Sequence, residues 1–280
     1  MQVSNVLLED SFRYTDENTS MEVRSQQIMD LAEIDYYCKC INEAIIINDA
    51  VWEIEVEKGV TLIDWLYSSQ NKGSHDDKAM LIQILTKQKK MEKCEDAQII
   101  DISLGKWRNA ACNKKQYVEK RRDILTGIKK VQEYYDFMRS CFINCYFSDD
   151  MLQEMKYIED FQDNTGEITK ALSVLNDEAI ELYLKYKNNL DEAMRELSCK
   201  LKRECSLDPG HKSKLKFMFT YENLDHNEQQ MLSRLIACEP HIKLIRPDSN
   251  LRIYFKWIDE NIANGKKVLI GRVGRHPYKK

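Results

Sequence analysis

The placement of proline divides the chain into two parts. All four prolines lie in the last quarter of the sequence, and the first 208 residues contain none. Because proline breaks the interior of a helix, its absence allows long helices in the first part. Asp208, Pro209 and Gly210 form a turn sequence. The chain is therefore predicted to have a mainly helical body over residues 1–208 and a small second domain over residues 209–280.

Apolar residues of the body recur at every third or fourth position, which is the spacing of one helix face. Such sets run from Ile28 to Ile45, from Ile124 to Phe142 and from Ile168 to Leu201. They are too short for a long coiled coil and predict a helical bundle. Residues 1–19 are aperiodic and are expected to be a loose arm. Strands are expected at Trp52–Glu57 and Gln98–Ser103.

The tail changes to the two-residue period of strands. Leu251–Trp257 alternates strictly, which places Arg252, Tyr254 and Lys256 together on an open polar face. The tail is further predicted to form strands over 214–221, 238–246 and 268–276, and a helix over 226–237. The last strand is apolar on both faces, as a central strand is. The predicted fold class is α+β, with a mostly helical N-terminal body followed by a small antiparallel-sheet C-terminal domain.

Charge is unevenly distributed along the chain. Residues 211–280 contain 14 Lys or Arg and 7 Asp or Glu, although the whole chain has a net charge of −4. A basic domain on an acidic body indicates an anionic ligand, such as nucleic acid. The alternative is that the two parts neutralise each other across their interface, and both interpretations remain open.

The cysteine pattern and the absence of an apolar run long enough to cross a bilayer both indicate a cytoplasmic protein. The nine cysteines are scattered and form no Cys-x-x-Cys pair, which is typical of a reducing compartment. No apolar run approaches the ~20 residues needed to cross a bilayer, so no membrane partner is expected. Neither Cys38 with Cys40 nor Cys141 with Cys145 has a second pair at zinc-finger spacing. These cysteines are expected to be buried thiols, and neither a metal nor another cofactor is predicted.

Basic and aromatic residues of the tail form a candidate nucleic-acid-binding surface. Arginine forks onto phosphate oxygens, lysine adds charge, and tyrosine can stack on bases. The candidate binding residues are Lys214, Lys216, Lys243, Tyr254, Lys256, Arg272 and Arg275. The alternative is an ordinary sheet with a solvated polar face.

The same strands carry a candidate catalytic set. His241 and His276 are suited to act as acid and base in phosphodiester cleavage, because imidazole titrates near neutral pH. Arg252 is suited to stabilise the charge of the transition state. The alternative is that each histidine is structural.

The tail resembles the C-terminal half of the RelE/YoeB-type toxins, at Arg252–Phe255 and at Val268–His276 with Tyr278. The resemblance covers about residues 211–280, where one short helix at most stands for the family's two-helix opening. It implies a curved antiparallel sheet and metal-independent cleavage of messenger RNA, often on the ribosome. It also implies that Arg252 is the phosphate-stabilising arginine and that His276 and Tyr278 are the terminal catalytic and stacking pair. The block Cys238–Leu244 is similar to uncharacterised bacterial proteins found among phage-defence genes.

Two hypotheses follow for the function. The first is a cytoplasmic, metal-independent endoribonuclease of toxin or antiviral-defence type, whose helical body regulates it or docks a protein partner such as an antitoxin. The second is a non-enzymatic subunit of a bacterial defence complex that binds nucleic acid or protein. Catalysis requires Arg252 and a histidine to lie on the same face of the sheet, which the fold decides.

Overall fold

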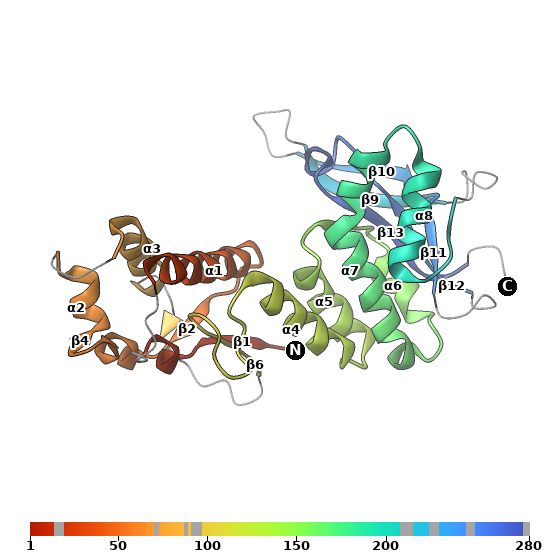
Figure 1. Cartoon of the computed structure of the whole chain (residues 1–280). Helices are drawn as coiled ribbons and strands as arrows, with labels where there is room; N and C mark the ends of the chain where they lie inside the picture. Colours follow the sequence, from red (N-terminus) through yellow and green to blue (C-terminus); the bar gives the residue numbers. More distant parts are fainter. Residues whose placement is uncertain are drawn as a thin grey trace. The chain divides into compact units, whose positions relative to one another are not determined.

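The computed structural model describes residues 1–13, 20–69, 73–86, 89–90, 97–207, 215–223, 230–244 and 250–276. The chain is α+β, with several small sheets among its helices (Figure 1). It divides into two compact units, Met1–Ile124 and Leu125–Lys280. This division differs from the predicted boundary at Asp208–Gly210, a segment that lies outside the described residues. No helix in the described part of the chain combines the length and the apolar character that a membrane span requires.

The first unit contains a four-stranded parallel sheet in the order β5-β2-β1-β6, which the bundle prediction did not include (Figure 1). Parallel neighbours need crossover connections, and α1 joins β1 to β2 in this way. The strands and helices of this unit are β1 (Val3–Leu7), α1 (Met21–Cys40), β2 (Ile45–Ile47), β3 (Glu55–Glu57), β4 (Val60–Thr61), α2 (Leu62–Tyr67), α3 (His75–Thr86), β5 (Lys89–Lys90), β6 (Gln98–Ile102) and the greater part of α4 (Lys114–Thr126).

The expectation of a loose N-terminal arm is wrong, because β1 is an inner strand with a partner on each side. Asn5 in its centre is buried. Its amide donates to Glu43 Oε2 at 2.8 Å, and the hydroxyl of Tyr117 on α4 donates to its Oδ1 at 2.8 Å. These hydrogen bonds satisfy a buried polar group. A pattern that counts apolar residues therefore misses this strand.

Two of the strands predicted in the body have different outcomes. Gln98–Ile102 is the strand β6, so that prediction is confirmed. The segment Trp52–Glu57 was predicted as one strand, but only Glu55–Glu57 is extended, and a short 3-10 helix covers Asp49–Glu53.

The second unit is built on a five-stranded sheet in the order β7-β13-β12-β11-β8. The parallel pair β7–β13 joins residues that are far apart in the sequence, and the other pairs are antiparallel. Helices α7 and α8 pack against each other, α7 contacts β13 and α8 contacts β8 (Figure 1). The elements are α5 (Val131–Cys141), β7 (Cys145–Phe147), α6 (Met151–Lys156), α7 (Phe161–Tyr186), α8 (Leu190–Leu201), β8 (Cys205–Ser206), β11 (His241–Lys243), β12 (Leu251–Lys256) and β13 (Val268–Arg275).

A separate hairpin covers part of this sheet. It consists of β9 (Lys216–Asn223) and β10 (Gln230–Ala237), paired along their whole length. The predicted helix over 226–237 is therefore wrong where the structure describes it, because residues 230–237 are a strand. Leu232 and Ile236 are four residues apart and suit a helix face, yet they also share a strand face with Arg234. Pairing with β9 decides between the two periods.

The prediction that the last strand is central is confirmed. β13 lies between β7 and β12, and Val268, Leu269, Ile270 and Val273 are all buried. Leu269 packs in the hairpin's core with Phe219 and Cys238.

Candidate functional site

One face of the five-stranded sheet brings together three of the four residues predicted to be catalytic, namely His241, Arg252 and His276. His241 lies directly opposite Tyr254 in the ladder, with ring centroids 5.1 Å apart. The ring of His276 approaches the same tyrosine from the end of β13, at 6.4 Å and edge-on. Arg252 is two residues before Tyr254 on β12, so strand alternation places it on this face. We call Ser206, His241, Arg252, Tyr254 and His276 the His241–His276 cluster.

The cluster is buried, so the prediction of an open polar strand face is wrong. The exposed fractions are 5% for His241 and Arg252 and 0% for Tyr254, whereas His276 is partly exposed. Phe217 of β9 lies beside Tyr254, with ring centroids 6.3 Å apart, because the hairpin packs on this face. Strict alternation predicts which side chains share a face, but it does not reveal that a hairpin will cover the polar one.

Ser206 is a member of the cluster that sequence reasoning missed. It lies opposite His241 in the pair β8–β11, and its Oγ is 3.1 Å from Nε2 of His241. The other ring nitrogen, Nδ1, is 3.4 Å from the backbone carbonyl of Glu239. A two-residue strand 35 positions before the histidine gives no periodic signal, so only the sheet pairing reveals the contact.

Burial also affects the arginine. It lowers the pKa of Arg252 from its ordinary value, because the charged form loses hydration. A guanidinium nevertheless stays protonated in proteins. One of its nitrogens donates to the carbonyl of Leu251 at 3.2 Å. The cluster thus combines the permanent cation of Arg252 with the imidazoles of His241 and His276. Acid–base chemistry on an anion requires groups of these two kinds.

Four of the predicted RNA-binding cations form ion pairs within the protein. Lys243 pairs with Glu204, Lys256 with Asp259 at 2.7 Å, Arg272 with Glu154 at 2.7 Å and Arg275 with Glu159. Lys216 is exposed on β9, whereas Lys214 and Tyr278 lie outside the described residues.

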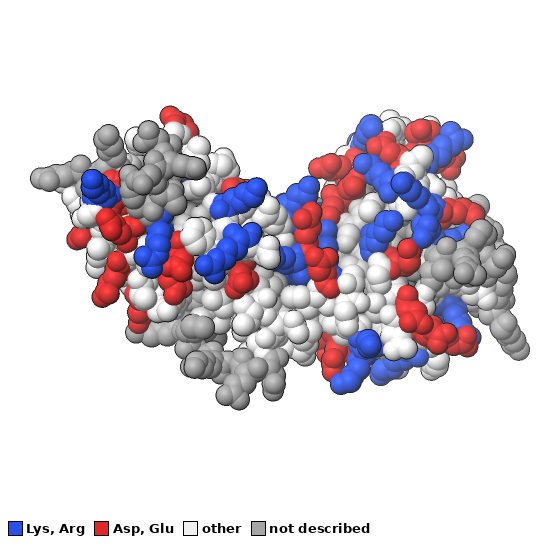
Figure 2. All heavy atoms as spheres, turned by 60° about the horizontal axis from the view of Figure 1, so that its bottom comes forward, with Lys and Arg blue, Asp and Glu red and all other residues white. Residues whose placement is uncertain are grey.

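Basic and acidic side chains also lie close together on the surface. Figure 2 shows one face of the molecule, on which basic and acidic side chains are interspersed. The excess of basic residues in the tail sequence is therefore locally balanced at these four positions, by Asp259 of the tail itself and by three carboxylates from earlier in the chain.

Among the residues that the structure describes, the cysteines and other metal-binding side chains form no second site. In the part of the chain that the structure describes, no three His, Cys, Asp or Glu side chains are arranged to hold a metal ion. Cys38, Cys141 and Cys145 are buried thiols as predicted, but Cys40 is exposed. Burial raises the pKa of Cys38 to about 12, which makes it unreactive at neutral pH.

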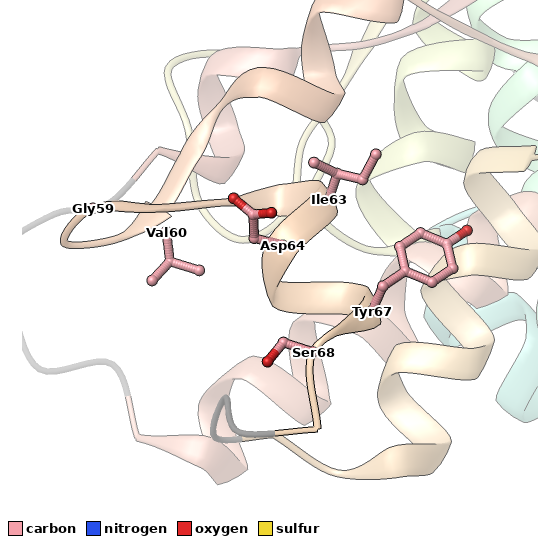
Figure 3. Close-up of a pocket in the computed structure, with 6 residues that line it drawn as sticks. All are labelled: Gly59, Val60, Ile63, Asp64, Tyr67 and Ser68. Atoms are coloured by element: carbon pink, nitrogen blue, oxygen red, sulfur yellow. The ribbon is translucent and has the colours of Figure 1, made fainter.

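The first unit offers a shallow depression between the β3–β4 turn and α2 (Figure 3). Its lining residues are Gly59, Val60, Ile63, Asp64, Tyr67 and Ser68. Asp64 is the one charged lining residue, and its carboxylate accepts from the hydroxyl of Thr61 at 2.6 Å in the cap of α2. The carboxylate of Asp64 therefore serves the cap of α2.

A smaller pocket in the same unit lies beside Trp65. Its polar groups satisfy one another, since both Arg24 and the indole of Trp65 donate to Glu57 Oε1 at 3.0 Å. The guanidinium of Arg24 and the ammonium of Lys78 also lie over the Trp65 ring, at 5.2 and 5.1 Å from its centroid. These contacts hold the helices α1, α2 and α3 together.

The chain matches no protein-family model, no curated protein and no solved structure.

Proposed function

We propose that the protein is a cytoplasmic, metal-independent endoribonuclease of the toxin or antiviral-defence type, acting on RNA through the His241–His276 cluster. One observation carries the proposal, namely the approach of His241 and His276 to the same tyrosine on the sheet face that also carries Arg252. Two imidazoles and a cation around one phosphate are sufficient for cleavage next to a 2′-hydroxyl.

The roles follow from the environment of each residue. His241 accepts the proton of the 2′-hydroxyl, whose oxygen then bonds to phosphorus. His276, which is partly exposed, donates a proton to the leaving 5′-oxygen. Arg252 stabilises the charge on the phosphate oxygens, as the RelE/YoeB resemblance implies. Tyr278 is the proposed stacking partner of a base.

The order of elements in the second unit supports the resemblance. The helices α7 and α8 precede the strands β11, β12 and β13 within one compact unit, where the tail alone offered no two-helix opening. The RelE-like domain is therefore proposed to extend upstream of residue 209. The first unit is proposed to regulate the enzyme or to dock a protein partner such as an antitoxin.

Access to the cluster limits how the substrate enters. Arg252 and Tyr254 are buried, so RNA approaches from the side of His276. The hairpin residues that cover Tyr254, such as Phe217, then move aside. The target is RNA with an unpaired segment, free or bound to the ribosome.

The test measures RNA cleavage and RNA affinity for the same variants, with a chelator present to exclude a contaminating metal nuclease. Arg252→Lys keeps the charge but loses the bidentate fork, and should slow cleavage ~10²–10³-fold with little change in affinity. His241→Gln and His276→Gln should each cost ~10²–10⁴-fold. His75→Gln is the matched control, because His75 is exposed on α3 of the other unit. Absence of cleavage by the wild type, even with its native partners, would end the proposal.

The ion pairs favour a second candidate, a non-enzymatic subunit that binds another protein. Four of the predicted RNA-binding cations already have carboxylate partners, whereas Met231 and Leu235 on β10 are exposed by 57% and 59%. For RNA held by phosphate contacts, affinity falls steeply with salt. Binding that does not depend on salt, with no RNA cleavage, would favour the protein-binding role.

A further inference from the structure

The contact of His241 with a backbone carbonyl indicates which nitrogen of the imidazole carries the proton. The backbone carbonyl of Glu239 can only accept a hydrogen bond, so its contact with Nδ1 requires a hydrogen on that nitrogen. In the neutral ring Nε2 is then an acceptor. The hydroxyl of Ser206, 3.1 Å away, must donate to it.

We infer that Ser206 holds His241 as the Nδ1–H tautomer, with the lone pair of Nε2 accepting from the serine hydroxyl. The inference rests on the proposed function, in which the proton of the 2′-hydroxyl reaches Nε2 by way of the serine hydroxyl. It adds a residue that none of the sequence patterns indicated.

The pairing of β8 with β11 holds Ser206 and His241 in contact. Ser206 and His241 face each other in the β8–β11 ladder, and Cys205 pairs with Ile242 in the next position. On the other side of β11, Tyr254 lies against the imidazole. The ring is thus held between a hydroxyl and an aromatic ring, and a rotation that exchanged its two nitrogens would break both hydrogen bonds.

A serine hydroxyl suits both protonation states of the base. It donates to Nε2 while the ring is neutral. In the proposed reaction the serine hydroxyl passes its own proton to Nε2 and takes up the proton of the 2′-hydroxyl. At the same time the O2′–P bond forms and the bond from phosphorus to the 5′-oxygen breaks, with the proton for that oxygen coming from His276. The serine oxygen then accepts from the new Nε2–H, because a hydroxyl has both a donor and acceptor lone pairs.

The experiment reads the tautomer directly from the nitrogen chemical shifts of the full chain labelled with ¹⁵N-histidine, at a pH where the imidazole is neutral. His241 is assigned by the signal lost in His241→Gln. In the wild type we expect Nδ1 to be protonated. In Ser206→Ala the population should move toward the Nε2–H form that isolated histidine prefers, and Ser206→Thr should restore the wild-type spectrum.

The signal of His276 is the internal control, and the same spectra report whether each variant is folded. If the variants cleave RNA, Ser206→Ala should lose about 3- to 10-fold in rate, the size of one neutral hydrogen bond, and Ser206→Thr should regain it. Wild-type His241 in the Nε2–H form, or an unchanged tautomer in Ser206→Ala, would overturn the inference. This readout does not need enzymatic activity, so failure of the nuclease proposal remains distinguishable.

Discussion

Gly271 of β13 lies directly against Phe217 of β9, so closely that a Cβ atom on Gly271 would overlap the phenyl ring. The same atom would lie 2.9 Å from Sγ of Cys238, at the end of the hairpin. The hairpin can therefore approach the sheet, and cover Tyr254, only because this position has no side chain. Ser148 also donates to the carbonyl of Gly271 at 2.7 Å, which fixes the backbone there.

Gly271→Ala is expected to destabilise the protein by ~1–3 kcal/mol, the usual cost of overpacking a core. The matched control is Gly166→Ala. Gly166 is exposed within α7, and a Cβ there would meet nothing within 4 Å. This control should stabilise the protein by ~0.5–1 kcal/mol, because alanine is the better helix former. Denaturant unfolding measures both, and equal effects of the two substitutions would contradict the close packing.

Glu43→Gln should be strongly destabilising. The carboxylate of Glu43 accepts from both terminal nitrogens of Arg121, at 2.6 and 2.8 Å, and the side chain of Arg121 is 0% exposed. Loss of the carboxylate leaves a buried cation without its counter-charge, which costs ~3–5 kcal/mol. Asp10→Asn is the control, since its pair with Arg13 is exposed and contributes ~0–1 kcal/mol. A loss no larger than that of the control would show that water reaches Arg121.

Asp259 gives a pH dependence with a defined sign. Burial alone would raise its pKa, but hydrogen bonds from Lys256 and Asn261 outweigh burial and lower the pKa below its ordinary value. Its contribution to stability is therefore complete above the unfolded pKa of about 4 and is lost as the pH falls through the lower folded pKa. The gap in unfolding free energy between wild type and Asp259→Asn should narrow on acidification below about pH 4. A gap that stays constant down to pH 2 would contradict this assignment.

A fragment of residues 209–280 should not fold on its own, whereas residues 125–280 should. β13 needs β7 as its parallel neighbour, and β11 needs β8, but both partners lie before residue 209. The shorter fragment also lacks α7 and α8, so its apolar strand faces would be exposed to water. Circular dichroism and amide dispersion of the two fragments measure this. A well-dispersed spectrum from the short fragment would instead support the boundary predicted from proline.

The sequence predicted those features that depend on one local period. The periodic sets around Leu172 and Leu197 are the helices α7 and α8, and the alternation in Leu251–Trp257 correctly places Arg252 with Tyr254. The set from Ile124 to Phe142 is interrupted between α4 and α5, where Ile128 lies outside both helices. The sequence could not predict that the tail's sheet recruits β7, because parallel pairing with a three-residue strand leaves no pattern in either segment.

The candidate site, too, could be predicted from the sequence only in part. Strand alternation predicted that His241 and Lys243 share a face, and the register adds that Tyr254 and Arg252 lie opposite them. The contact with Ser206 depends on a short edge strand, and the carboxylate partners of Lys243, Arg272 and Arg275 lie 39 or more positions away in the sequence. Tertiary structure alone brings those groups together.

The parallel pairing of β7 with β13 also determines when the second unit can fold during translation. Val268 pairs with Cys145, 123 residues earlier in the chain. At 5–20 residues per second, a ribosome takes roughly 6–25 s to add that stretch. During this interval β7 and then α7 are made, while the central strand β13 that both contact does not yet exist. The nascent second unit therefore exposes its apolar surface to chaperones and proteases for seconds. The His241–His276 cluster cannot assemble until the ribosome has translated the chain as far as His276.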